Sequence, residues 1–198
     1  MNRIKRTMMV IVGSFIMGIG ISIVVSSGVG SDPMSLFWLG LSKQLSITFG
    51  QANILVNIVF IGIVFFINRS YINIGSLLSP LVVAVTTDVL SKLFFQDYPF
   101  YLRVIICMFG FILLAFGVAY YSQANLGMGA YEALVFSIAK QSKIAVGYIR
   151  TIIDITLTII GIILGAQFGI GTLLAILLMG TGIQFFLKLL KKPLNNQE

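Results

Sequence analysis

Residues 7–27 read TMMVIVGSFIMGIGISIVVSS and contain no charged side chain. A helix needs about 20 apolar residues to cross the ~30 Å hydrocarbon core of a bilayer, so this stretch predicts a transmembrane helix. Five further apolar runs of similar length follow, at roughly 50–67, 74–94, 101–121, 147–165 and 171–190. The six runs use most of the chain and leave no segment long enough for a soluble domain.

The composition agrees with a protein whose main solvent is lipid. Of the 198 residues, 58% are hydrophobic and 10% are charged, whereas about a quarter of the residues in a soluble domain are charged. The net charge of +7 does not predict nucleic-acid binding, because the Lys and Arg residues lie at the ends of the apolar runs rather than on one basic face. The chain has no His and a single cysteine, Cys107, so we expect no metal, no cofactor and no internal disulfide.

The two halves of the chain resemble each other. At an offset of 97 residues the aligned pairs are Arg6 and Arg103, Gly13 and Gly110, Gly20 and Gly117, Gly30 and Gly127, Lys43 and Lys140, Gly50 and Gly147, and Asn57 and Asp154. After one deletion the offset becomes 96, and the pairs are Gly75 and Gly171, Ser76 and Thr172, Asp88 and Gln184, and Lys92 and Lys188. Self-similarity at a fixed offset indicates an internal repeat.

Each half contains three predicted spans, and an odd number of crossings makes the halves antiparallel. We therefore predict an all-α membrane protein of six transmembrane helices arranged as a 3+3 inverted repeat, as in many secondary transporters. In each half, a short amphipathic or re-entrant helix follows the first span. The first repeat covers residues 1–97, the second covers 98–192, and residues 193–198 form a tail.

The distribution of basic residues predicts the orientation. With the N-terminus in the cytoplasm, ten of the 13 Lys and Arg residues fall on the cytoplasmic side, Lys191 and Lys192 among them, and only Lys43, Lys92 and Arg103 fall outside. Because cytoplasmic loops carry an excess of Lys and Arg, we expect a multi-pass protein of the bacterial plasma membrane with both termini in the cytoplasm.

Glycine-rich turns precede the two short helices. Gly28-Val29-Gly30-Ser31-Asp32-Pro33 leads into residues 34–45, and Gly127-Met128-Gly129-Ala130 leads into residues 131–142. Ser31 or Asp32 can cap the first short helix, whose first turn contains Pro33.

Two placements of the short helices are open. They can lie flat at the membrane surface with Trp38 and Tyr131 as anchors. Alternatively they dip into the membrane from opposite faces, which makes Gly28, Gly30, Pro33, Gly127 and Gly129 parts of re-entrant turns. In the second placement the positive ends of the helices converge, where an anion or carboxylate would be held.

Polar residues within the apolar segments or at their edges are candidates for binding a substrate or ion. They are Asp32, Asn57, Asp88, Glu132, Asp154 and Gln184. An ionisable group inside the bilayer costs several kcal/mol, so Asp154, near the middle of its run, could bind a proton or cation that drives transport. Asp154 could equally pair with Arg150 one turn earlier, and Glu132 could simply stabilise the first turn of its helix.

The turns Gly28-Val29-Gly30-Ser31-Asp32-Pro33 and Leu126-Gly127-Met128-Gly129-Ala130-Tyr131-Glu132, together with the duplicated layout, resemble the YczE/YyaS/YitT family of bacterial membrane proteins. The YczE-like branch carries a similar leucine-glycine-x-glycine-proline/alanine-aromatic-acid motif in each half. The first copy here departs from that motif, with Met34 and Ser35 at the aromatic and acidic positions. The resemblance covers nearly the whole chain and implies a membrane location, a fold type and a transporter-like role.

We therefore expect a small secondary transporter or permease for an unknown solute or ion. The alternative is a scaffold, assembly factor or regulatory partner of another membrane protein. We do not expect an enzyme, because Val29-Gly30-Ser31-Asp32 lacks the glycine-x-glycine-aspartate pattern of intramembrane aspartyl proteases and no catalytic triad can form without His. The expected partners are the lipid bilayer, a small solute or ion and a second copy in a homodimer, without nucleic acid.

Overall fold

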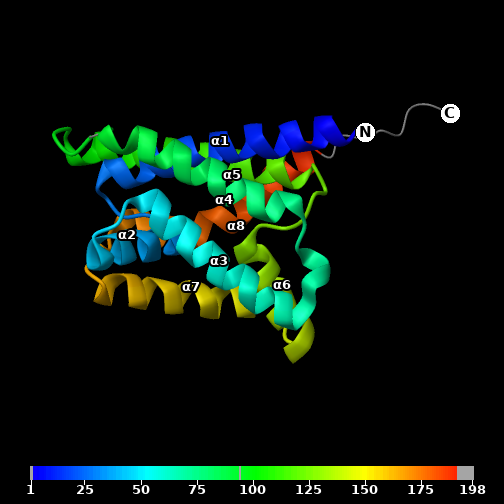
Figure 1. Ribbon diagram of the computed structural model, residues 1–198. Helices are drawn as coiled ribbons and strands as arrows, with labels where there is room; N and C mark the ends of the chain where they lie inside the picture. Colours follow the sequence, from blue (N-terminus) through cyan, green and yellow to red (C-terminus); the bar gives the residue numbers. More distant parts are fainter. Residues whose placement is uncertain (1, 94, 191–198) are drawn as a thin grey trace.

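A computed structural model of the chain describes residues 2–93 and 95–190 (Figure 1). Within these residues every regular element is helical: α1 (Arg3–Ser27), α2 (Pro33–Leu45), α3 (Phe49–Asn68), α4 (Ile74–Val89), α5 (Phe100–Ser122), α6 (Ala130–Ser142), α7 (Val146–Ile163) and α8 (Ile170–Leu190), with 3₁₀ turns at Arg69–Tyr71 and Leu90–Lys92. The predicted tail at residues 193–198 and two of the predicted cytoplasmic cations, Lys191 and Lys192, lie outside the described residues.

The prediction of six spans and two short helices is confirmed. The six long helices are long and apolar enough to cross a membrane, and their outward faces carry exposed apolar side chains such as Phe66 and Leu177. The predicted third span, 74–94, is too long, because the α-helix ends at Val89 and continues as a 3₁₀ turn. The Ser91 hydroxyl donates to the Asp88 carbonyl (2.7 Å) at this end. The fifth span ends at Ile163 instead of 165, since Gly165 adopts a positive φ of 90°.

Side-chain caps fix where three of the helices begin. Asp32 caps α2 by accepting from the Ser35 amide (3.1 Å), and Pro33 occupies the first helical position, where no N–H is needed. Thr48 and Asn73 each form a capping box, at the start of α3 and of α4. Of the two predicted caps for α2, Asp32 is therefore the one used.

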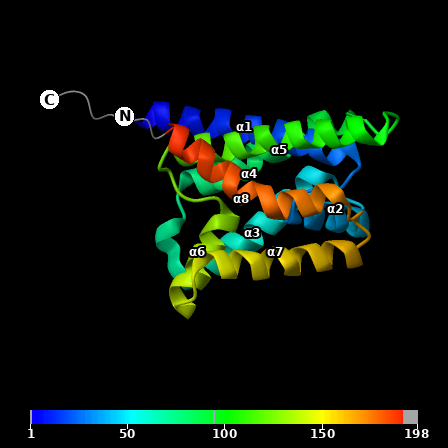
Figure 2. The same cartoon turned by 180° about the vertical axis from the view of Figure 1, so that it is seen from behind.

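The helices are arranged in three levels that can be followed in two views (Figures 1 and 2). The antiparallel helices α1 and α5 lie side by side along one face, α4 and α8 lie beneath them, and α3 and α7 lie farthest away. The short helices exchange partners between the halves, since α2 packs on α7 and α6 packs on α3.

Glycines bring the α1 and α5 backbones into contact at two points. Gly20 lies against the Gly110 carbonyl, and Gly117 lies against the Gly13 carbonyl. Each of these contacts is the counterpart of the other under the offset of 97. Small residues at a crossing allow helices in lipid to approach closely and gain packing energy.

The two glycine-rich turns bind the opposite halves of the chain in the same way. The Val29 carbonyl accepts from the Gly171 amide at the start of α8 (2.8 Å), and the Leu126 carbonyl accepts from the Gly75 amide at the start of α4 (2.8 Å). Gly30 (φ 109°) and Gly127 (φ 102°) stand at the closest approach, where a side chain would meet Thr172 or Asn73 and Ser76. Glycine is required at both positions by backbone conformation and by space.

The α1–α5 crossing should not tolerate a single added methyl group. In Gly20→Ala the new Cβ would lie 2.6 Å from the Leu114 amide nitrogen, and in Gly117→Ala it would lie 2.6 Å from the Met17 amide nitrogen. We expect each variant to lose about 1–3 kcal/mol through overpacking, measured as a lower melting temperature in detergent. The control is Gly62→Ala, because a Cβ at Gly62 meets none of the described residues within 4 Å. Equal melting temperatures for all three variants would contradict the packing described.

Candidate functional site

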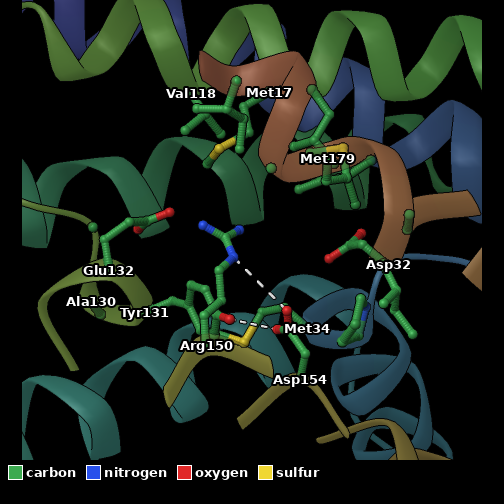
Figure 3. Close-up of a pocket in the computed structure, with 18 of the residues that line it drawn as sticks. Met17, Asp32, Met34, Val118, Ala130, Tyr131, Glu132, Arg150, Asp154 and Met179 are labelled. Carbon is green, nitrogen blue, oxygen red and sulfur yellow. Dashed lines mark hydrogen bonds and ion pairs between the residues drawn. The ribbon is translucent and has the colours of Figure 1, made fainter. Parts of the chain in front are cut away.

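A cavity of about 390 Å³ lies at the centre of the bundle and is lined by residues from all eight helices (Figure 3). Of the predicted site residues, the cavity lining includes Asp32, Pro33, Asn57, Gly129, Glu132, Asp154 and Gln184. The N-terminal ends of both short helices open onto this cavity. Residues far apart in the sequence are thereby brought to one place.

Asp32 lies at the α2 side of the cavity. Its Oδ2 atom accepts from the Ser35 amide, whereas its Oδ1 atom is buried and has no hydrogen-bond partner among the described residues. Figure 3 shows the carboxylate directed into the space that the Arg150 side chain enters from the other side. A buried acceptor without a partner is unfavourable by about 1–3 kcal/mol, so this atom is suited to receive a donor from a bound molecule.

The opposite side of the cavity is formed by a cluster on α6 and α7. The Tyr131 hydroxyl donates to Asp154 Oδ1, and Arg150 Nε lies 3.8 Å from Asp154 Oδ2. The Arg150 guanidinium also lies over the Tyr131 ring, with its Cζ 5.3 Å from the ring centroid. The predicted pairing of Asp154 with Arg150 is present, and it leaves the arginine 35% exposed.

Glu132 lies in the first turn of α6 beside the same cavity. Its carboxylate folds back over Gly129, the residue before the helix, at the place that a Cβ of Gly129 would occupy. Since Glu132 stands at the positive end of α6, its charge is stabilised by the helix dipole. The two short helices therefore each begin with one of the protein's own carboxylates.

Neutral polar groups complete the lining. The Asn57 amide donates to the Asn53 carbonyl (2.8 Å) and to its side-chain oxygen, and the Asn53 amide donates to the Pro80 carbonyl (3.2 Å). Both asparagines are buried, while Gln184 is exposed at the edge of the cavity.

Asp88 is the predicted site residue that the structure places elsewhere. Its Oδ1 atom accepts from the Gly50 amide (2.7 Å) and its Oδ2 atom accepts from the Thr48 hydroxyl (2.7 Å). These bonds join the end of α4 to the start of α3, away from the central cavity. Gly28, another predicted turn residue, lies at the end of α1, where its carbonyl accepts from Arg103 (2.6 Å).

Trp38 and Tyr131 face the interior, which does not match a placement of the short helices flat on the membrane with these rings as anchors. Trp38 is 5% exposed, lines the cavity and packs edge-on against Phe49 with 5.7 Å between ring centroids. Its indole nitrogen has no hydrogen-bond partner among the described residues.

A second cavity, of about 640 Å³, adjoins the central one and shares Tyr131, Glu132 and Arg150 with it. Its other lining residues lie at the end of the bundle where α1 begins, and include Tyr71, Ser122, Asn125, Val146 and Leu187. The site is therefore continuous with a vestibule at this end.

Burial changes the pKa of two titratable groups of the site that lie outside the six long helices. Burial raises the pKa of Asp32, and hydrogen bonding from Ser35 opposes this rise. Burial also raises the pKa of Tyr131, and the charge of Asp154 raises it further. Tyr131 consequently remains a hydroxyl donor to Asp154 at physiological pH.

Sequence reasoning missed Trp38, Tyr131 and Asn53 as parts of the site. Asn53 could have been predicted as a site residue, because it is four residues before Asn57 and its polar side chain therefore lies on the same helix face. The rings of Trp38 and Tyr131 could not have been predicted, because an aromatic residue in a short amphipathic helix is equally suited to the membrane surface.

The comparisons with known proteins support the resemblance. Residues 4–188 match a family described as "Family of unknown function (DUF6198)". The chain is 28% identical over 177 residues to an uncharacterized protein of Haemophilus influenzae, covering 89% of this chain and 81% of that protein. No solved structure matches the chain.

Two further relatives come from Bacillus subtilis. The uncharacterized membrane protein YczE is 25% identical over 176 residues, which cover 88% of this chain and 82% of YczE. The uncharacterized protein YyaS is 26% identical over 186 residues, which cover 91% of this chain and 92% of YyaS. The predicted likeness to YczE and YyaS is confirmed. The likeness to the membrane protein YczE and the six apolar helices together identify the chain as a multi-pass membrane protein.

Asp88 should affect stability rather than the chemistry of the cavity. Removing its carboxylate in Asp88→Ala leaves the Gly50 amide and the Thr48 hydroxyl unpaired, and hydrogen bonds to charged groups contribute about 1.5–3 kcal/mol. We expect a loss of about 2 kcal/mol in the free energy of unfolding in detergent. Asp97→Ala, at an exposed position, is the matched control, and equal stability of the two variants would show that Asp88 does not join α3 to α4.

Proposed function

We propose that the chain, which belongs to the DUF6198 family of unknown function, is a small secondary transporter with a central binding site and alternating access. The proposal rests on a difference between two helix ends that occupy equivalent positions in the two halves of the chain. One place is closed by direct helix contact, and its counterpart is open.

The closed place is where α3 begins beside the end of α4. Gly50 is buried against the Ala84 carbonyl and the Asp88 carboxylate, and both Gly50 and Thr48 donate to Asp88. Asn53 adds a bond from α3 to Pro80 of α4. These contacts seal the end of the bundle where α1 ends.

The counterpart is where α7 begins beside the end of α8. The residues equivalent to Gly50, Ala84 and Asp88 are Gly147, Gly180 and Gln184. In the described part of the chain, neither Gly147 nor Gly180 has a neighbour within 4 Å of a Cβ position. Over the described parts of the chain, no hydrogen bond joins α7 to α8. Figure 2 shows the two helices diverging toward this end, where the vestibule lies.

Reciprocal contacts between the halves support the inverted repeat. The paired glycine contacts of α1 and α5, the exchange of α2 and α6, and the bonds from each turn to the opposite half all obey the same offsets. In inverted-repeat transporters, one repeat or bundle rocks or gates against the other around a fixed site, which opens the two sides alternately. The present structure corresponds to the state open at the end where α1 begins.

The short helices fit the re-entrant placement. Each enters the bundle through an irregular turn whose backbone is bonded to another helix, and non-helical backbone is tolerated at membrane depth only under such conditions. With the N-terminus in the cytoplasm of a bacterial cell, as the basic residues favour, the vestibule faces the cytoplasm.

Transport should depend on the carboxylates that line the cavity and not on an exposed carboxylate outside it. Purified protein in liposomes is offered a broad panel of solutes, with and without a proton gradient. We expect movement of at least one solute, reduced at least tenfold in Asp154→Asn and retained in Asp97→Asn, because Asp154 lines the cavity whereas Asp97 is exposed and does not line it. Failure to move any solute, together with a stoichiometric partner in mild detergent, would favour the scaffold alternative.

Alternating access predicts that α7 and α8 meet at the open end in the other state. In a Cys107→Ser background, Ala145→Cys and Gln184→Cys replace the counterparts of Thr48 and Asp88. We expect a short bifunctional thiol reagent to join them in membranes and to trap the chain closed on this side, with reduction of a cleavable reagent restoring the starting state. Each single cysteine variant is the control, and a double variant that never cross-links would contradict the proposed motion.

A further inference from the structure

We infer that the central site takes an organic cation, a protonated amine attached to an apolar or aromatic body. The inference rests on the proposed transport function and adds the chemical class of the substrate. It reverses the expectation that the converging helix ends would hold an anion.

The charge of the cavity is the first reason. Its charged lining residues are three carboxylates, Asp32, Glu132 and Asp154, and one guanidinium, Arg150. Their formal sum is −2, inside a bundle whose outer faces carry apolar side chains. Unpaired charge away from water is strongly unfavourable, so a bound cation stabilises the ionised form of these carboxylates, whose charge Arg150 alone does not balance.

The helix ends are the second reason. A helix N-terminus attracts anions because its first amides are free and its dipole is positive there. Here Asp32 accepts from the first turn of α2, and Glu132 lies over the start of α6. An anionic solute would meet these carboxylates instead of free amides.

Groups without partners point to a ligand independently of the charge count. Among the residues that the structure describes, Asp32 Oδ1 is an acceptor without a donor, and the indole nitrogen of Trp38 is a donor without an acceptor. Trp38 is 5% exposed and lines the same cavity. A protonated amine supplies the donor that Asp32 lacks, and a polar atom or water carried with it can reach Trp38.

The other residues that line the cavity indicate what the uncharged part of the solute should be. Most of them are apolar, with the thioethers of Met17, Met34 and Met179 around the gap (Figure 3). Arg150, held over the Tyr131 ring at 5.3 Å, shows how a cation is accommodated here, because aromatic faces attract positive charge. The solute is therefore expected to combine one positive charge with apolar surface.

Three molecules of nearly the same size separate charge from shape: benzylammonium, benzyl alcohol and benzoate. The full chain in lipid nanodiscs is titrated with each, by calorimetry and by the emission of Trp38, the one tryptophan of the chain. We expect benzylammonium to bind at least tenfold more tightly than benzyl alcohol, and benzoate to bind more weakly than either. Asp32→Asn should weaken benzylammonium binding at least tenfold, while Asp97→Asn should leave it unchanged.

Because Asp32 also caps α2, Glu132→Gln serves as a second variant that keeps this cap, and it too should weaken the binding of benzylammonium. Benzoate binding as tightly as benzylammonium, the absence of any preference for benzylammonium, or wild-type affinity in both variants would overturn the inference. The titration requires no transport. A cation that binds but does not cross liposomes refutes the transport function alone, and a neutral or anionic solute that crosses without cation binding refutes the substrate class alone.

Discussion

The bonds between each glycine-rich turn and the opposite half are the contacts on which the rest of the structure depends. A bilayer offers no water to backbone groups, so an interrupted helix must find partners elsewhere in the protein. Val29 and Leu126 obtain these partners from the first amides of α8 and α4, which are themselves unpaired at a helix start. Each of these hydrogen bonds pairs a carbonyl of a turn with an amide at a helix start, and both groups would otherwise be unpaired. The two bonds also fix where the short helices begin and place their carboxylates at a common centre.

The parts of the fold that follow from local chemistry could be predicted from the sequence. Apolar runs of sufficient length mark the spans, and the Asp32-Pro33 pair marks the start of α2. The pairing of Asp154 with Arg150 also follows from spacing along one helix. Each of these depends on residues a few positions apart, which the chain brings together by forming a helix.

The parts that depend on distant segments could not be predicted. Asp88 and Gln184 occupy equivalent positions, yet one bonds to the start of α3 and the other is exposed beside an open cavity. The difference arises because α3 packs on α4 while α7 is splayed from α8. Tyr131 meets Asp154 across two helices, and no periodicity in either helix indicates that contact.

The residues at the two equivalent helix ends have a consequence for the resting state. Thr48 and Gly50 donate to a charged acceptor, Asp88, whereas the counterparts of Thr48 and Asp88 are Ala145, which has no hydroxyl, and the neutral Gln184. Charge-assisted hydrogen bonds contribute about 1.5–3 kcal/mol, and about 1.4 kcal/mol corresponds to a tenfold change in population. In the proposed cycle the two end states are thus unequal in free energy. In that cycle the empty protein would occupy the present state, in which the Asp88 hydrogen bonds are formed, almost entirely. The solute would have to supply the difference by binding the other state more tightly.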